Sequence, residues 1–396
     1  MMAAGTAASL GASVTLIEKN PRVGRKIMIT GKGRCNILNN CDVPTFINNV
    51  PVNARFLYSA INSFTPGDAF AFFESIGVPL KTERGNRSYP QSDKAVDVVD
   101  ALRRFVLDSG VTIVNDTAGS LLLENGGAVG VKCQRQTYFA DSVIVCCGGK
   151  SYPLTGSTGD GYILAKQAGH TVTQLKPSLV PLESPDPECK SMQGLSLRNV
   201  SLKITDKTTD KTVYSDFGEM LFTHFGISGP MVLSASSHLR EILPNQYVAS
   251  IDLKPALDSE QLDKRLQKDF SENANRDVSN AFSKLLPRKM IVPVLKRWGV
   301  PFDKKCHSVT RGERRRLCAV LKSFTVELSG FRPIEEAIVT SGGVKVSEIN
   351  PKTMESKLVS GLYFAGEVID VDAYTGGFNL QIAWSTGRLA GENAAY

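Results

Sequence analysis

A basic, glycine-containing segment near the N-terminus has the residue types of an anion-binding loop. It reads Gly24-Arg25-Lys26-Ile27-Met28-Ile29-Thr30-Gly31-Lys32-Gly33-Arg34-Cys35-Asn36. Gly31 and Gly33 would let the backbone approach a flat or anionic ligand closely. Charge for phosphate groups would come from Arg25, Lys26, Lys32 and Arg34. A basic surface turn has the same composition, so the segment alone does not decide between the two interpretations.

The residues before this loop favour the ligand-binding interpretation. Residues 1–10 are rich in Ala and predict a helix, and residues 13–17 predict a β-branched strand that ends at Glu18. In dinucleotide-binding folds, an acidic residue about 20 positions after the glycine-rich loop binds the ribose hydroxyls. Counting back from Glu18 places that loop before Met1, so we expect the first strand and its loop to be missing from this chain.

A glycine pair in the middle of the chain follows an apolar strand. Residues 141–147 are typical of a strand buried on both faces of a parallel sheet, and Gly148 and Gly149 close it. The turn at 156–161 (Gly-Ser-Thr-Gly-Asp-Gly) then opens a helix. Taken alone, an ordinary strand–loop–helix connection explains this turn.

A second arrangement of this kind lies near the C-terminus. The strand predicted at 362–365 ends at Gly366 and Glu367, where a cofactor could approach the backbone. Gly376 and Gly377 then start a helix, whose N-terminus would carry about half a positive charge. That charge would stabilise the electron-rich pyrimidine edge of a reduced flavin. A helix docked on a sheet explains the helix, but it does not explain Gly366-Glu367 and Gly376-Gly377 together.

Composition excludes several classes of protein. The 396 residues are 42% hydrophobic and 21% charged, as in ordinary globular proteins. No apolar run reaches the roughly 20 residues of a membrane span, and no signal peptide opens the chain. The eight cysteines show no metal-binding spacing, so we expect no metal site and a cytoplasmic protein.

The net charge of +7 leaves the partner open. Basic residues are mostly dispersed, apart from a run of four arginines at 311 and 314–316. We interpret this run as a solvated helix face in preference to an RNA-binding patch, so a nucleic-acid partner is not expected. The oligomeric state is not predicted.

Changes in the pattern of apolar, charged and glycine residues along the chain predict an interrupted cofactor domain. We expect an α/β protein with a split Rossmann-like FAD-binding domain, an inserted antiparallel β-barrel and a small helical insert. The predicted boundaries are 1–176 and 337–396 for the FAD-binding domain, 177–254 and 322–336 for the barrel, and 255–321 for the helical insert.

Several specific motifs, spread over nearly the whole chain, resemble one family. They include Gly-Lys-Gly-Arg-Cys-Asn at 31–36, Leu-Phe-Thr-His-Phe-Gly-Ile-Ser-Gly-Pro at 221–230, and Gly-Gly-Phe-Asn-Leu-Gln at 376–381. With these motifs the chain resembles the BaiN-like family of FAD-dependent oxidoreductases, also described as aminoacetone-oxidase-like flavoproteins.

The resemblance implies an FAD site built from distant segments. Glu18 would meet the adenosine ribose, and Arg25 and Lys26 would lie near the pyrophosphate. Residues Gly33, Arg34, Cys35 and Asn36 would line the isoalloxazine, Gly366 and Glu367 would meet the ribityl-phosphate region, and Asn379, Leu380 and Gln381 would lie at the pyrimidine side. The predicted set is completed by Lys19, Gly31, Gly148, Gly149, Gly377 and Phe378.

The predicted activity is a flavin-dependent oxidoreduction. A small organic substrate, or NAD(P)H bound transiently at the flavin face, would exchange a hydride with flavin N5 before an acceptor is reduced. His224, in the Thr-His-Phe-Gly segment, is the candidate proton donor, although a structural histidine explains it equally well. An RNA-associated flavoprotein and an inactive fragment without the phosphate loop are the alternatives.

Overall fold

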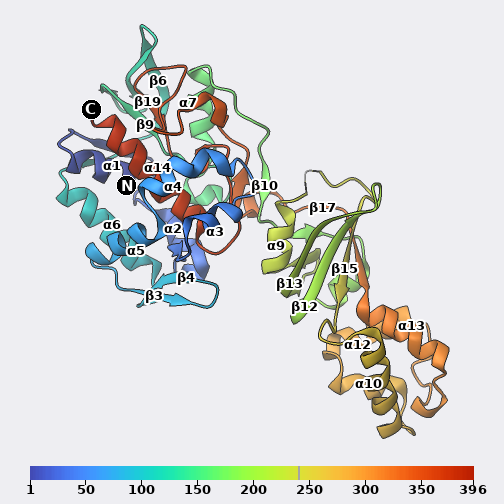
Figure 1. Cartoon of the computed structure of the whole chain (residues 1–396). Helices are drawn as coiled ribbons and strands as arrows, with labels where there is room; N and C mark the ends of the chain where they lie inside the picture. The colour runs from blue at the N-terminus through green and yellow to red at the C-terminus, as the bar shows by residue number, and fades with distance from the viewer. Residues whose placement is uncertain (240) are drawn as a thin grey trace. The chain divides into compact units, whose positions relative to one another are not determined.

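The computed structural model describes residues 1–239 and 241–396, which form two compact units. Unit 1 comprises Met1–Ser178 and Pro333–Tyr396, and unit 2 comprises Leu179–Arg332. Figure 1 shows the two parts of unit 1, blue to green and red, wound together. Unit 1 is therefore discontinuous in sequence, with unit 2 inserted into it.

Unit 1 contains two parallel strand pairs. β1 (Thr15–Glu18) pairs with β5 (Thr112–Asn115), and β9 (Val143–Val145) pairs with β19 (Leu362–Phe364). The second pair joins residues more than 200 positions apart, which brings the glycines that follow β9 and β19 to the same edge. The short apolar strands predicted from the sequence are thus present and parallel.

Helices cover these strands. α14 (Phe378–Ala394) packs against α1 (Met2–Ser9), where a Cβ on Gly391 would lie 2.4 Å from the Ala3 carbonyl oxygen. Small residues therefore allow a close approach of the two helices. The other helices of unit 1 are α2 (Arg25–Ile29), α3 (Val43–Asn48), α4 (Tyr58–Ser63), α5 (Pro66–Ser75), α6 (Ala95–Asp108) and α7 (Asp160–Gln167).

Antiparallel strands complete unit 1. One sheet has the order β2–β4–β3 (Leu38–Asn39, Arg87–Pro90, Leu80–Glu83), and another has the order β6–β7–β8 (Ala118–Glu124, Gly127–Cys133, Thr137–Phe139). β10 (Lys176–Ser178) pairs with β18 (Val339–Ser341) at the two places where the chain leaves and re-enters unit 1.

Unit 2 is built on one antiparallel sheet of seven strands. Their order is β16 (Phe324–Leu328), β15 (Tyr247–Asp252), β12 (Ser196–Asp206), β13 (Lys211–Phe222), β14 (Gly226–Ser228), β11 (Leu182–Glu183) and β17 (Gly330–Phe331). Among residues 1–239 and 241–396, no pairing joins β16 to β17, so the sheet is not a closed barrel. The predicted barrel is not confirmed. Its two edge strands, β16 and β17, are consecutive in the chain with Ser329 alone between them, and one residue is too short a connection for a hairpin.

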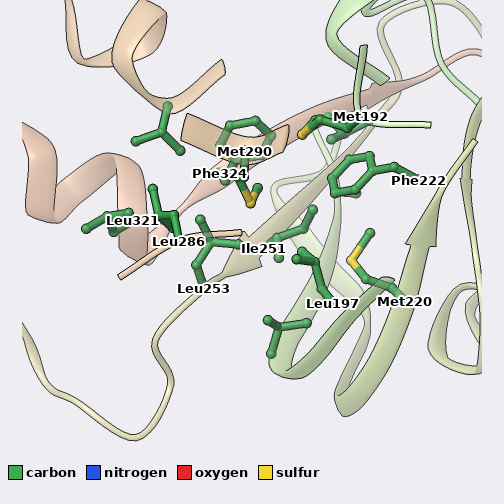
Figure 2. Packing of buried hydrophobic residues seen from close by; sticks show 14 of the residues in the cluster. Met192, Leu197, Met220, Phe222, Ile251, Leu253, Leu286, Met290, Leu321 and Phe324 are labelled. Carbon is green, nitrogen blue, oxygen red and sulfur yellow. The ribbon is translucent and has the colours of Figure 1, made fainter. Parts of the chain in front are cut away.

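Helices of unit 2 share a core with its sheet. α8 (Pro187–Ser191) and α9 (Pro230–Ser236) lie among the strands in sequence, and α10 (Ser259–Glu272), α11 (Val278–Ala281), α12 (Arg288–Trp298) and α13 (Arg311–Lys322) form the helical part. Figure 2 shows Met290, Leu286 and Leu321 from the helical part packed near Phe324 and Ile251 of the sheet. All five are buried in one cluster, so burial of their apolar area couples the helical part to the sheet.

Candidate cofactor site

The end of β1 presents a carboxylate that is held in a fixed orientation. Oε1 of Glu18 accepts hydrogen bonds from the backbone N–H and the side-chain Nδ2 of Asn20, at 2.8 and 2.7 Å. Asn20 also donates to the Thr155 carbonyl oxygen at 3.2 Å and accepts from Arg25 Nη1 at 3.1 Å. Within the described residues both bonds to the carboxylate end on Oε1, which leaves Oε2 open for the hydroxyls of a ligand.

A second group joins the early loop to the strand β19. Lys26 Nζ lies 2.5 Å from Glu367 Oε2 and donates to Ser151 Oγ at 2.6 Å. The Ser151 hydroxyl donates to the other oxygen of Glu367 at 3.1 Å, and the backbone N–H of Thr340 donates to that oxygen at 2.9 Å. Four stretches of chain therefore meet around the Glu367 carboxylate.

The glycine pair after β9 is required by this packing. A Cβ on Gly149 would lie 2.4 Å from Thr340 Oγ1 and 2.8 Å from Glu367 Oε1. The Thr340 hydroxyl accepts instead from the backbone N–H groups of Lys150 and Ser151, at 2.8 and 3.2 Å. Gly148 has φ of +72°, which turns the chain at this point.

The C-terminal glycine pair lies against the strand that follows the early loop. A Cβ on Gly377 would lie 2.2 Å from the carbonyl carbon of Leu38, and Asn39 Nδ2 donates to the Gly376 carbonyl oxygen at 3.0 Å. Trp384 Nε1 of α14 donates to the Ile37 carbonyl oxygen at 2.9 Å. The two glycine-bearing segments that were predicted to bind one ring system are therefore neighbours.

Cations of the early loop differ in their partners. Arg34 forms ion pairs with Glu83 and Asp93, at 2.5 and 2.6 Å, and its guanidinium lies 4.1 Å from the centre of the Tyr89 ring. Hydrogen bonds from Arg34 lower the pKa of Glu83, and those from Lys81 and Arg34 lower the pKa of Asp93. The Arg34 side chain therefore holds its own loop in place, which differs from the expected contact with a phosphate.

Two other cations of this loop, Arg25 and Lys32, are exposed and form no ion pair within residues 1–239 and 241–396. Lys19, beside Glu18, pairs with Asp160 of α7 at 2.5 Å. Among the predicted cations, Arg25 and Lys32 are thus the ones available to an anionic ligand.

Cys35 and Asn36 turn inward. Cys35 is fully buried with φ of +61°, and burial raises the pKa of its thiol to about 12. Asn36 Oδ1 is buried and has no hydrogen-bond partner among the described residues. A buried acceptor without a donor fits a bound molecule that supplies an N–H or hydroxyl group, and FAD carries both.

Side chains at the start of α14 support the loop before it. Asn379 Oδ1 accepts from the Ala373 N–H at 2.9 Å, and its Nδ2 donates to the Ala373 carbonyl oxygen at 2.7 Å. Gln381 is buried and donates to the Phe64 carbonyl oxygen at 3.1 Å. Phe378 packs on Phe46 with ring centres 5.5 Å apart, and Leu380 is half-buried. Contacts of this segment with a ligand would therefore come from its backbone N–H groups.

Three predicted glycines differ in how much open space surrounds their backbone: Gly31, Gly33 and Gly366. A Cβ on Gly33 would meet no atom of the described chain within 4 Å, whereas a Cβ on Gly31 would lie 2.9 Å from the Asn36 N. Gly366 has φ of +74° and donates its N–H to Thr386 Oγ1 at 3.0 Å. Gly33 is thus the most open backbone of the three.

His224 belongs to unit 2. It lies in the tight turn between β13 and β14, where the Thr223 N–H donates to the Gly226 carbonyl oxygen at 2.9 Å. Its ring is exposed and contacts the Phe225 ring, with ring centres 5.0 Å apart.

Three residues of the site were missed by reasoning from the sequence: Asn20, Ser151 and Thr340. Asn20 belongs to the segment Glu-Lys-Asn at 18–20 and Thr340 to the segment Val-Thr-Ser-Gly-Gly-Val at 339–344. Both segments also resemble the family's motifs, so the signal was present. Ser151 had no sequence signal beyond its position two residues after Gly149.

The family model described as HI0933-like protein Rossmann domain matches residues 1–393. The chain belongs to this family. The prediction of a BaiN-like FAD-dependent oxidoreductase with a Rossmann-like fold is therefore confirmed.

Curated relatives of this HI0933-like protein cover nearly its whole length. The 3-dehydro-bile acid delta(4,6)-reductase of Clostridium scindens is 30% identical over 97% of this chain and 93% of its own. The ribosomal RNA dihydrouridine synthase of Escherichia coli is 31% identical over 98% of this chain and 93% of its own. A solved quinol–fumarate reductase superposes with a TM-score of 0.50 at 14% identity, covering 100% of this chain and 68% of that one. That likeness concerns the fold alone.

No described helix is long and apolar enough to cross a membrane, and the described residues include no cluster of three or more His, Cys, Asp or Glu suited to a metal ion.

Proposed function

We propose that this FAD-dependent oxidoreductase uses NAD(P)H to reduce a carbon–carbon double bond in a small organic ring compound. The names of its relatives support this: one is a delta(4,6)-reductase of a bile acid, and the other is a synthase of dihydrouridine in ribosomal RNA. The observation that carries the proposal is the meeting of the early loop, the β9 turn and the β19 turn around Glu367.

Residues of unit 1 would hold the cofactor, and we assign 1–176 and 337–396 to the FAD-binding domain. When bound, FAD supplies two-electron chemistry. Glu18 would bind ribose hydroxyls through its open oxygen, Arg25 would face the phosphates, and the N–H groups at the start of α14 would face the pyrimidine edge. Lys26 would neutralise Glu367, so that a carboxylate can lie beside an anionic ligand.

His224 is the proposed proton donor to the substrate. An imidazole can both donate and accept a proton, which suits it to this role. Reduction of a double bond needs one hydride equivalent and one proton, and His224 would supply the proton.

The experiment is anaerobic oxidation of NADH or NADPH by the purified flavoprotein, with a 4-en-3-one steroid or a uridine-containing RNA as acceptor. We expect pyridine-nucleotide oxidation that depends on one acceptor, with a saturated product. Turnover should fall by roughly a hundredfold or more in His224→Asn, without loss of flavin reduction by NAD(P)H. A protein that stays colourless with excess FAD, or that reduces neither acceptor, contradicts the proposal.

A uridine in RNA is the second candidate substrate. One observation favours it: residues 255–321 hold fifteen of the 46 Lys and Arg but eight of the 39 Asp and Glu, so their net charge equals the +7 of the whole chain. The acceptor comparison in the experiment above separates the two candidates.

A further inference from the structure

The positive charge of the chain is concentrated in the helical part of unit 2. Residues 255–321 carry a net charge of +7, and the remaining residues of the chain therefore balance to zero. The helices differ strongly among themselves. α10 has three cations and four acids, α12 has four cations and no acid, and α13 has five cations and one acid.

Some of these cations have structural partners. All three cations of α10 pair with acids one turn away, as in Arg265 with Asp269 at 2.9 Å. Arg314 joins α13 to α10 through two hydrogen bonds to Asp263, at 2.6 and 3.1 Å. Arg297 binds Glu188 and covers the Phe324 ring at 3.7 Å. These side chains are explained by the fold.

A second group of cations is exposed and has no ion pair within the described residues. Arg288, Lys289 and Lys296 lie on the outer side of α12, whose buried residues include Met290, Val294 and Trp298. In the part of the chain that the structure describes, Lys289 donates only to the Gln193 carbonyl oxygen, at 2.7 Å. On α13, Arg311 and Arg315 are one turn apart, and Arg316 follows. We call these six residues the basic surface.

A solvated helix face does not account for the basic surface. On α10, each of the three cations pairs with an acid one turn away, and the six cations of the basic surface form no such ion pair within the described residues. Like charges one turn apart, such as Arg311 and Arg315, destabilise a helix. A cost of this kind is offset when an anionic partner neutralises the charges.

We infer that the basic surface on α12 and α13 is a docking site for the phosphate backbone of RNA. Four of its six residues are arginines, whose planar guanidinium groups bind phosphate oxygens in pairs. The exposed large hydrophobic residues of the helical part are Val292 and Phe302, too few to insert into a lipid surface. An exposed Phe ring is suited to stacking on an unpaired base.

This inference extends the second candidate function, but it does not depend on turnover. Binding of a fluorescent RNA hairpin to the full-length flavoprotein would be followed by anisotropy between about 50 and 200 mM salt. We expect the triple variant Arg311→Gln, Arg315→Gln, Arg316→Gln to lose roughly tenfold or more in affinity. The slope of log K against log salt should decrease in magnitude by about 2–3, because three phosphate contacts are lost and each contributes about 0.7–0.9. The α12 triple variant, with Arg288, Lys289 and Lys296 changed to Gln, should behave alike.

The matched control removes the same charge from the same helical part. In Lys264→Gln, Arg265→Gln, Lys268→Gln the cations lost are the paired ones of α10, so we expect an affinity within about twofold of the wild type. An equal loss of RNA affinity in this control and in the α13 triple variant would show that only the net charge matters, and it would overturn the inference. So would wild-type binding to phosphatidylserine vesicles without binding to RNA.

Failure of the two proposals can be told apart. Absent NAD(P)H-dependent reduction together with RNA binding that needs the basic surface would contradict the proposed reduction alone. Flavin content and far-ultraviolet circular dichroism of each variant show that loss of binding does not come from unfolding.

Discussion

At the scale of single residues, the two arginines of the early loop have different tasks. Arg34 is bound by Glu83, Asp93 and the Tyr89 ring, so its charge is already neutralised. Among the described residues, Arg25 has one neutral partner, Asn20, and its side chain is exposed. Residue type alone does not reveal this division, because both arginines stand in the same basic motif.

The first prediction separates these tasks. Arg25→Gln should weaken FAD binding roughly tenfold, because it removes a charge-assisted contact to phosphate, with little change in stability. Arg34→Gln should lower the free energy of unfolding of the apoprotein by about 1 kcal/mol, since exposed ion pairs contribute little each. Flavin fluorescence titration and urea unfolding measure the two effects. Equal losses of FAD affinity in both variants would contradict the division.

The second prediction concerns Cys35. Since burial raises the pKa of this thiol to about 12, it stays protonated at pH 8 and cannot act as a nucleophile. The folded protein should leave Cys35 unmodified by iodoacetamide, whereas urea-unfolded protein should be alkylated there, as peptide mass spectrometry can show. The protonated thiol stabilises the fold fully below pH 9.0, its ordinary pKa, and this contribution is lost as the pH rises towards 12. Rapid labelling of the native protein at Cys35 would show that the thiol is accessible.

At the scale of elements, the junction between β2 and the start of α14 organises the site. Gly377 lies against the Leu38 carbonyl group, and Trp384 donates to the Ile37 carbonyl oxygen from two turns further along the helix. These contacts fix the helix N-terminus relative to the loop that carries Asn36. A cofactor bound by both segments would therefore meet a preformed surface.

The third prediction tests this junction. Gly377→Ala should cost about 2–4 kcal/mol, because its Cβ would clash with Leu38 and φ is +101°. Gly33→Ala is the matched control, with φ of +84° and no atom of the described residues within 4 Å of an added Cβ, so we expect only about 1 kcal/mol of backbone strain. Urea unfolding of the apoprotein gives both values. Similar costs at the two positions would mean that the contact with Leu38 contributes nothing.

At the scale of the whole molecule, each unit has a hydrophobic core of its own. One buried cluster consists of residues between Leu182 and Leu328, all in unit 2, and the other two clusters lie in unit 1. The proposed cofactor residues belong to unit 1, whereas the basic surface belongs to unit 2. Cofactor retention and RNA docking should therefore respond to different substitutions.

The fourth prediction follows from these separate cores. Calorimetry of the apoprotein should resolve two unfolding transitions, and FAD should raise the midpoint of only one of them. At a concentration of about 100 times Kd the ligand adds about 2.7 kcal/mol to the unit that binds it. Proteolysis during heating should identify that unit as unit 1. A single transition that shifts as a whole with FAD would show that the units unfold together.

The sequence by itself determined the local features and the family. The strand ending at Glu18, the glycine pairs after β9 and β19, and the helix that follows Gly377 are all present, because local periodicity and positive φ values leave a direct trace in residue type. The family followed from motifs spread over the chain. Which FAD contacts each predicted residue makes stays a prediction.

Only the tertiary structure decided how these pieces combine. The ion pair between Lys26 and Glu367 joins residues 341 positions apart, and no local pattern encodes such a pairing. The inward turn of Gln381, the locking of Arg34 and the open sheet of unit 2 likewise depend on which segments become neighbours. Side-chain partners are chosen by packing after the chain has folded, and for that reason composition predicted the chemistry of the site better than its contacts.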